Sequence, residues 1–243
     1  MNHMKKLLTF VVFILLPLGA FSQVTWNVKA GLGSSGLLSY GGEDARFSFR
    51  VGGGANVPFG RGFFVNPSLY FVRKGFTFDG FYGSEQISEA HYNVRMDYLE
   101  LPVNVGFRLD LGKDCGLSFY TGPYVACGLN SKARVNISNS DYKHTFSENL
   151  FDKGSNLLGV VYNTNNKQVV MPKFKRIDAG LQSGIQIDYR HLLIGAEIGI
   201  GLTHVANQSA VDPGVLPTIV SLLTFGTASP RNIVGQVMIG YRF

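Results

Sequence analysis

The residues best suited to chemistry in this sequence are isolated charged side chains within apolar, glycine-rich segments. Glu100, together with Asp178 or Glu197, could supply the two carboxylates of a general acid/base site. Cations occur in segments of the same kind, and buried charges of opposite sign form ion pairs because an unpaired buried charge is costly. The mixture therefore favours a structural ion-pair network over a catalytic pair. The predicted network comprises Lys29, Arg50, Glu100, Arg108, Asp178, Glu197 and Arg242.

Segments in which polar and apolar residues alternate would position these charges. In 99–107, 177–187 and 194–202, nearly every second residue is Leu, Ile, Val, Ala or Phe, and most of the others are polar, charged or glycine. A period of two residues is typical of a β-strand whose two faces meet different surroundings. We expect eight such strands, at about 24–34, 47–57, 63–76, 94–109, 116–131, 173–189, 191–205 and 230–243.

The connections between the expected strands are alternately long and short. The short ones are 58–62, 110–115 and the neighbourhood of Arg190. The long ones are about 35–46, 77–93, 132–172 and 206–229. Short turns at one end and long loops at the other are typical of barrels in the bacterial outer membrane, with the turns in the periplasm. The sequence therefore predicts an all-β fold, an eight-stranded antiparallel up-and-down transmembrane β-barrel with both termini in the periplasm.

The two faces of these strands indicate which side meets lipid. The apolar rows carry no charge at the strand centres, whereas a water-soluble barrel would turn them inward and show a densely charged outer face. The opposite rows hold mainly Gly, Asn, Gln, Ser and isolated charges, which suits a narrow interior. Side chains can fill the interior of an eight-stranded barrel. We therefore expect the charged network to close the lumen, with Lys74, Gln182 and Gln236 also pointing inward.

The composition agrees with an exported membrane protein. Only 16% of the 243 residues are charged, against about 25% in soluble domains. The net charge of +6 is not concentrated in a run that could bind nucleic acid. Lys5 and Lys6 precede an apolar run that ends at Ala20-Phe21-Ser22, which is typical of a signal peptide. We predict that residues 1–22 are cleaved and that 23–243 form the outer-membrane barrel domain.

The two cysteines are expected to be free. Twelve residues along one strand would separate Cys115 from Cys127 by roughly 40 Å. A disulfide allows only roughly 7 Å between Cα atoms.

Other motifs give little support for catalysis or for a cofactor. The histidines lack metal-ligand spacing, and "GGGANVPFG" lacks the Lys-Ser/Thr of a phosphate-binding loop. Thr203 and His204 lie at a strand end, followed by Ser209, but no nucleophile, base and orienting group occur at a defined spacing. We expect no enzyme activity, no metal and no cofactor. A lipid hydrolase at the barrel rim ranks third among the functions considered, after the two given at the end of this section.

Two long loops carry apolar residues that would be costly to expose to water. They either pack on the mouth of the barrel or bind another envelope protein, and both interpretations stay open. The candidate partner-binding residues are Leu157, Leu158 and Tyr162 in 132–172, and Leu216, Ile219, Leu222, Leu223 and Phe225 in 206–229.

Short motifs follow one another along nearly the whole chain after residue 22. They are "WNVKAGLGSSGL", "PSLYFVRKGF", "DYLELPVNVGF", "YTGPYVACGL", "IDAGLQSGIQIDY" and "IGYRF". This ordered set resembles the PorT-like outer-membrane β-barrel family of Gram-negative bacteria that use type IX secretion. The closing residues Ile239, Tyr241 and Phe243 look like the carboxy-terminal signal that the barrel-assembly machinery reads. The resemblance implies an outer-membrane protein that this machinery assembles in contact with outer-membrane lipid.

The function expected from these features is that of a non-enzymatic accessory or scaffold subunit of an envelope complex, and a secretion-associated complex is one option. Its extracellular loops would bind an envelope protein of unknown identity. The first alternative is a stand-alone structural or ligand-binding barrel.

Overall fold

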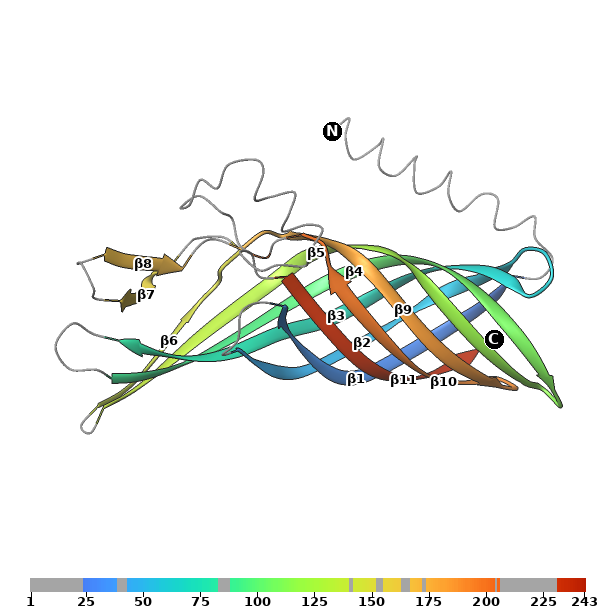
Figure 1. Cartoon of the computed structure of the whole chain (residues 1–243), viewed down its shortest axis with the longest axis horizontal. Helices are drawn as coiled ribbons and strands as arrows, with labels where there is room; N and C mark the ends of the chain where they lie inside the picture. Colours follow the sequence, from blue (N-terminus) through green and yellow to red (C-terminus); the bar gives the residue numbers. More distant parts are fainter. Residues whose placement is uncertain are drawn as a thin grey trace, which may run out of the picture.

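The described part of the chain forms one closed β-barrel, seen from the side in Figure 1. The computed structural model describes residues 24–38, 43–82, 88–139, 142–151, 155–162, 167–171, 174–203, 205 and 231–243. The expected signal peptide (1–22), His204 and the candidates Leu216, Ile219, Leu222, Leu223 and Phe225 lie outside the described residues. The side chains of Leu157, Leu158 and Tyr162 also lie outside those that are described.

Eight antiparallel strands form the wall of the barrel. They are β1 (Thr25–Leu38), β2 (Glu43–Pro58), β3 (Phe63–Tyr82), β4 (Ser88–Gly112), β5 (Cys115–Asn139), β9 (Ile177–Tyr189), β10 (Leu192–Gly201) and β11 (Arg231–Arg242). Around the barrel they follow the order β4, β3, β2, β1, β11, β10, β9, β5, and a further pairing of β4 with β5 closes the ring. The predicted eight-stranded all-β barrel is therefore confirmed. Cys115 and Cys127 both lie on β5 and are free, as predicted.

Three further strands lie where the sequence predicted the loop 132–172. β5 continues to Asn139, β6 (Tyr142–Glu148) pairs with its outer part, and β7 (Ser155–Tyr162) pairs with β8 (Lys167–Met171) in a separate sheet. The predicted loop 77–93 is likewise mostly strand, because β3 runs to Tyr82 and β4 begins at Ser88. Both loop predictions were wrong in extent.

A β-bulge explains why the alternation in β5 could not be followed beyond 131. Gly128 pairs with Tyr98, but Asn130 pairs with Asp97, so Leu129 is an extra residue in β5. Such a residue shifts all later side chains to the opposite face. The period of two therefore changes phase at Leu129.

Tight turns join the strands at one end of the barrel, which we call the turn end. Lys113 and Asp114, between β4 and β5, have positive φ angles of 51° and 64°. Two central residues of this kind form the hairpin turn whose twist matches that of the flanking strands. The amino-terminal end of β1 and the carboxy-terminal end of β11 also lie at this end, where Asn27 pairs with Arg242. The opposite end is called the loop end.

The outer wall is apolar and the interior is polar. Leu32 and Val237 on the outer face are 62% and 65% exposed, whereas Ser48 and Gln182 inside are at most 2% exposed. A water-soluble protein would bury such an extensive apolar surface. Apolar residues outside and polar residues inside are the arrangement of a barrel that is surrounded by lipid. Among the described residues, no helix is long and apolar enough to cross a membrane.

Candidate functional site

Five charged side chains from five strands fill the middle of the lumen. Glu100 of β4 lies between two cations, with its Oε1 2.9 Å from Arg50 Nη2 (β2) and its Oε2 2.8 Å from Lys74 Nζ (β3). Arg50 also forms an ion pair with Glu197 of β10, and Lys74 Nζ lies 3.2 Å from Asp178 Oδ2 of β9. Each of these side chains is at most 6% exposed, so two cations and three carboxylates are paired away from water. We call this group the mid-lumen cluster.

Neutral donors complete the hydrogen bonds of Asp178. Thr203 Oγ1 donates to Asp178 Oδ1 at 2.8 Å, and Asn232 Nδ2 and Tyr124 OH donate to Oδ2 at 3.0 and 3.3 Å. These donors hold the carboxylate of Asp178 in one orientation. Thr203, which the sequence suggested as part of a hydrolase site, therefore has a structural role in positioning Asp178.

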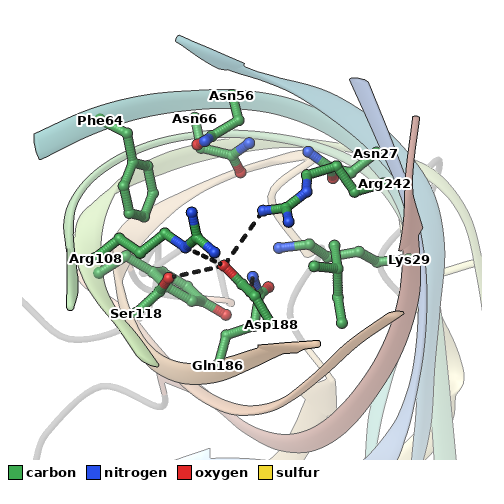
Figure 2. A pocket seen from close by; sticks show the side chains of 12 residues that line it. Asn27, Lys29, Asn56, Phe64, Asn66, Arg108, Ser118, Gln186, Asp188 and Arg242 are labelled. Atoms are coloured by element: carbon green, nitrogen blue, oxygen red, sulfur yellow. Dashed lines mark hydrogen bonds and ion pairs between the residues drawn. The ribbon is translucent and has the colours of Figure 1, made fainter. Parts of the chain in front are cut away.

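A second cluster lies nearer the turn end and is centred on Asp188 (Figure 2). Its Oδ2 lies 3.1 Å from Arg108 Nε and 3.5 Å from Arg242 Nη1, and it accepts a hydrogen bond from Ser118 Oγ at 3.2 Å. Gln186 Nε2 donates to Asp188 Oδ1 at 2.5 Å. The Arg108 contact is an ion pair without hydrogen-bond geometry, because its Nε has no hydrogen-bond partner. We call this group the turn-end cluster.

Lys29 faces a small cavity beside the turn-end cluster. The cavity has a volume of about 30 Å³, and Figure 2 shows Lys29, Arg108 and Arg242 around the same space. The Lys29 side chain is buried, and its Nζ lies 5.5 Å from the centre of the Tyr120 ring. Within the described part of the chain it forms no ion pair. Arg108 and Arg242 therefore share the carboxylate of Asp188, and Lys29 stands beside them without an ion pair.

The structure distributes the predicted network over these two clusters. Arg50, Glu100, Asp178 and Glu197 meet in the mid-lumen cluster, Arg108 and Arg242 bind Asp188, and Lys29 stands apart. The sequence analysis missed Asp188. The period of two in β9 would have identified it, because every second residue from Asp178 through Gln182 and Gln186 leads to Asp188. The alternating segment 177–187 stops one residue before Asp188, which lies next to the turn.

An apolar plug closes the lumen at the loop end. Leu150 and Phe151 fold into the barrel and are at most 1% exposed. Ser131 Oγ accepts a hydrogen bond from Leu150 N at 2.8 Å, and the rings of Phe151 and Tyr98 meet edge to face at 5.7 Å. Gly128 makes room, because a Cβ there would lie 2.5 Å from Phe151 Cζ. No sequence period marks this plug, since it consists of two apolar residues in a polar stretch.

The lumen has the properties of a support and a seal. The enclosed cavities beside its two charged clusters measure about 30 and 10 Å³, too small for a continuous channel, and the larger hollows of about 400 and 860 Å³ beside Arg108 and Arg242 are open at the turn end. Within the described ranges, no group of three or more His, Cys, Asp or Glu residues could hold a metal ion. The charged side chains connect strands on opposite sides of the wall, so their chief effect is to fix the barrel and block it.

The residues of the expected assembly signal lie at the turn end and face outward. Ile239, Tyr241 and Phe243 are all exposed on the outer wall. The Tyr241 ring stacks on His191 at 5.4 Å and meets Phe243 at 5.1 Å. Phe243 N also donates a hydrogen bond to Trp26 O at 2.9 Å, which attaches the last residue to the first strand. The chain end is therefore part of the wall.

A closed barrel with an apolar outer wall and an ion-paired lumen defines an outer-membrane β-barrel protein. The chain belongs to the family described as outer membrane protein beta-barrel domain, whose model matches residues 20–207. It is accordingly an outer-membrane protein. No curated protein matches the sequence.

Solved structures with a similar course of the chain are remote in sequence. The attachment invasion locus protein Ail of Yersinia pestis has 12% identity and a TM-score of 0.37, covering 90% of this chain and 97% of Ail. Neisserial surface protein A has 8% identity and a TM-score of 0.35, with the same coverage. The translocator domain of the autotransporter NalP from Neisseria meningitidis has 9% identity and a TM-score of 0.34, covering 100% of this chain and 98% of that domain. The fold assignment rests on the strand pairing described above.

Proposed function

We propose that the protein is a non-enzymatic barrel that acts as an accessory or scaffold subunit of an envelope protein complex. The observation that carries this proposal is the length of the wall on one side. β4 and β5 have 25 residues each, whereas about 9–11 residues cross a membrane. Together with β3 and β6 they project beyond the rest of the barrel at the loop end (Figure 1). A sheet that continues this far offers a platform for another protein.

The outermost strand of this platform supports partner binding by strand addition. β6 ends the order of the sheet, so its second edge has no partner strand among the described residues. An unpaired edge presents backbone donors and acceptors to an extended segment of another chain. The blocked lumen supports the same conclusion, because it favours a role at the surface over transport.

The proposal includes an orientation. The loop end faces the cell exterior, and both termini lie in the periplasm, as is general for outer-membrane barrels with short turns at one end. Ile239, Tyr241 and Phe243 then serve as the signal for the barrel-assembly machinery. The resemblance to PorT-like proteins favours a partner associated with type IX secretion.

The partner can be tested by isolating the protein from its own outer membranes in mild detergent after light crosslinking. A stoichiometric partner is expected with the native chain and not with a variant in which a Gly-Ser turn replaces 137–144. The matched control carries an insertion in the turn 59–62. Isolation of the barrel alone would instead support the stand-alone alternative. Altered membrane lipid on overexpression, abolished by His204→Ala, would support the lipid hydrolase.

The orientation can be tested by labelling whole cells with a membrane-impermeant maleimide. Cys115 and Cys127 are first replaced by Ser, so that no native thiol contributes to the labelling. Asn139→Cys at the loop end should then be labelled, whereas Arg61→Cys in the turn 59–62 should be labelled only after lysis. The reverse pattern would overturn the orientation.

A further inference from the structure

The outside of the barrel carries five cations on four neighbouring strands near the loop end. They are Arg46 (β2), Arg73 (β3), Arg95 (β4), Lys132 and Arg134 (β5), and we call them the cationic belt. Cross-strand pairing brings them together, because Gly75 pairs with Arg95, which pairs in turn with Lys132. Four adjacent strands span about 15 Å. The belt is therefore one compact surface.

The belt faces outward. On β4, Arg95 continues the exposed row of Leu101 and Leu99 by two-residue steps. On β5, the bulge turns Lys132 and Arg134 outward, since Ala133 between them is 2% exposed. Arg46 crosses the outside of β3 over Gly75, where a Cβ would lie only 3.1 Å from Arg46 Cδ. Glycine at position 75 thus allows Arg46 to reach Asn93, to which it donates a hydrogen bond.

The belt begins where the lipid-facing surface ends. Ten residues separate Leu109 from Leu99 on the outer face of β4, which corresponds to about 25 Å along the normal of a membrane for a tilted strand. That is the height of the apolar band of outer-membrane barrels. The Arg73 guanidinium also lies 4.8 Å from the centre of the Phe49 ring on the outer face. The cations therefore lie at the level of lipid headgroups.

Among the side chains that the structure describes, the belt has more positive charge than its carboxylates can balance. Asp97 is already bound by Arg73 Nε at 2.6 Å and lies 3.7 Å from Arg95 Nε, and Asp44, two residues before Arg46, is exposed. The Nε of Arg95 is buried without a hydrogen-bond partner. Arg134 forms no hydrogen bond or ion pair within the described part of the chain. Arg46 lies within electrostatic range of Arg73, Arg95 and Arg134.

We propose that the cationic belt binds the phosphate groups of a phosphorylated glycolipid in the leaflet at the loop end. Guanidinium groups bind phosphate through paired hydrogen bonds, and cations of one sign that are held together require such a counter-anion. A belt about 15 Å wide contacts more than one phosphate at once. This inference rests on the proposed orientation for its assignment to the outer leaflet. It concerns the outward faces of β2, β3, β4 and β5, whereas the proposed strand addition uses the free edge of β6.

The probe is diphosphoryl lipid A, added to the delipidated full-length barrel in non-ionic detergent, with bound lipid counted by native mass spectrometry. We expect saturable binding that weakens about tenfold or more in R46Q/R95Q/R134Q. Arg73 is left unchanged because its loss would leave Asp97 without its closest cation. Lys175→Gln removes an exposed cation at the same end but beside β9, and it should change the affinity less than twofold.

Two further probes distinguish binding of the lipid from binding of free phosphate. Monophosphoryl lipid A should bind more weakly than the diphosphoryl form, and inorganic phosphate at equal concentration should not compete. Competition by inorganic phosphate would show a free-anion site, and equal loss in Lys175→Gln would show general charge attraction; either result overturns the proposal. If the triple variant does not fold, R95Q/R134Q is used in its place, and its affinity for diphosphoryl lipid A should also fall. A barrel without a protein partner would leave this result unaffected, so the two proposals fail separately.

Discussion

Arg50 on β2 forms an ion pair with Glu197 on β10, although β1 and β11 lie between these two strands. Together with the 2.9 Å contact between Arg50 and Glu100 on β4, this pair connects distant parts of the wall through the lumen. The connection explains how a barrel with an apolar outside is held together from within. Its members are buried, so removing one of them leaves the charge of its partner unpaired and away from water.

Arg50→Met is expected to lower the free energy of unfolding by about 3–5 kcal/mol, because Glu197 then loses its cation in the buried interior. Adding Glu197→Gln to this variant should recover about 1 kcal/mol or more, because the two residues interact directly. Urea titration in lipid vesicles, followed by the fluorescence of Trp26, the only tryptophan, measures both values. Strict additivity of the two losses would show that the pair has no net coupling.

Lys29→Met should not reduce stability, in contrast to Asp188→Asn. Lys29 is buried without an ion pair, and an apolar side chain of similar length avoids the burial of its charge. Asp188 is the carboxylate shared by Arg108 and Arg242, so its neutralisation should cost about 3 kcal/mol or more. The same vesicle titration compares the two variants. A large loss in Lys29→Met would show that the ammonium group holds an anion or ordered water in the cavity.

The lipid-facing wall should be sensitive to charge according to depth. Val105→Arg, in the middle of the outer row of β4, is expected to cost about 2–4 kcal/mol, whereas Leu111→Arg near the turn end should cost about 0–1 kcal/mol. Both residues are exposed and lie on one strand, which makes them a matched pair. Equal losses in vesicles would contradict the assignment of this face to lipid.

The apolar plug should contribute to stability without being the only seal of the barrel. Phe151→Ala removes a buried ring and is expected to cost about 3–5 kcal/mol, and Gly128→Val should displace the same ring by a clash. Neither variant should show single-channel conductance in planar bilayers, because the mid-lumen cluster still closes the barrel. Conductance in Phe151→Ala would show that the plug alone seals the lumen.

The fold could be predicted from sequence because each wall strand has a period of two that separates an apolar row from a polar row. The same period identified inward charges such as Arg50, Glu100 and Asp178. It could not identify the partners of each charge, because contacts across the lumen depend on the tilt and stagger of the strands. It also missed the plug of Leu150 and Phe151, which has no period. The cationic belt was missed because Lys132 and Arg134 follow the bulge, where a fixed period assigns them to the wrong face.

The extra residue Leu129 separates β5 into two parts that can change independently. Below it, odd-numbered positions face lipid, and above it the even-numbered positions Lys132 and Arg134 face outward while Ser131 and Ala133 contact the interior. Deletion of Leu129 would remove only the bulge, because Gly128 and Asn130 would then follow each other and keep their partners Tyr98 and Asp97. Lys132 and Arg134 would still face outward, so this variant is expected to fold, which refolding into vesicles would reveal. The outer part of this strand can acquire new surface residues in evolution while the membrane-embedded wall keeps its pattern.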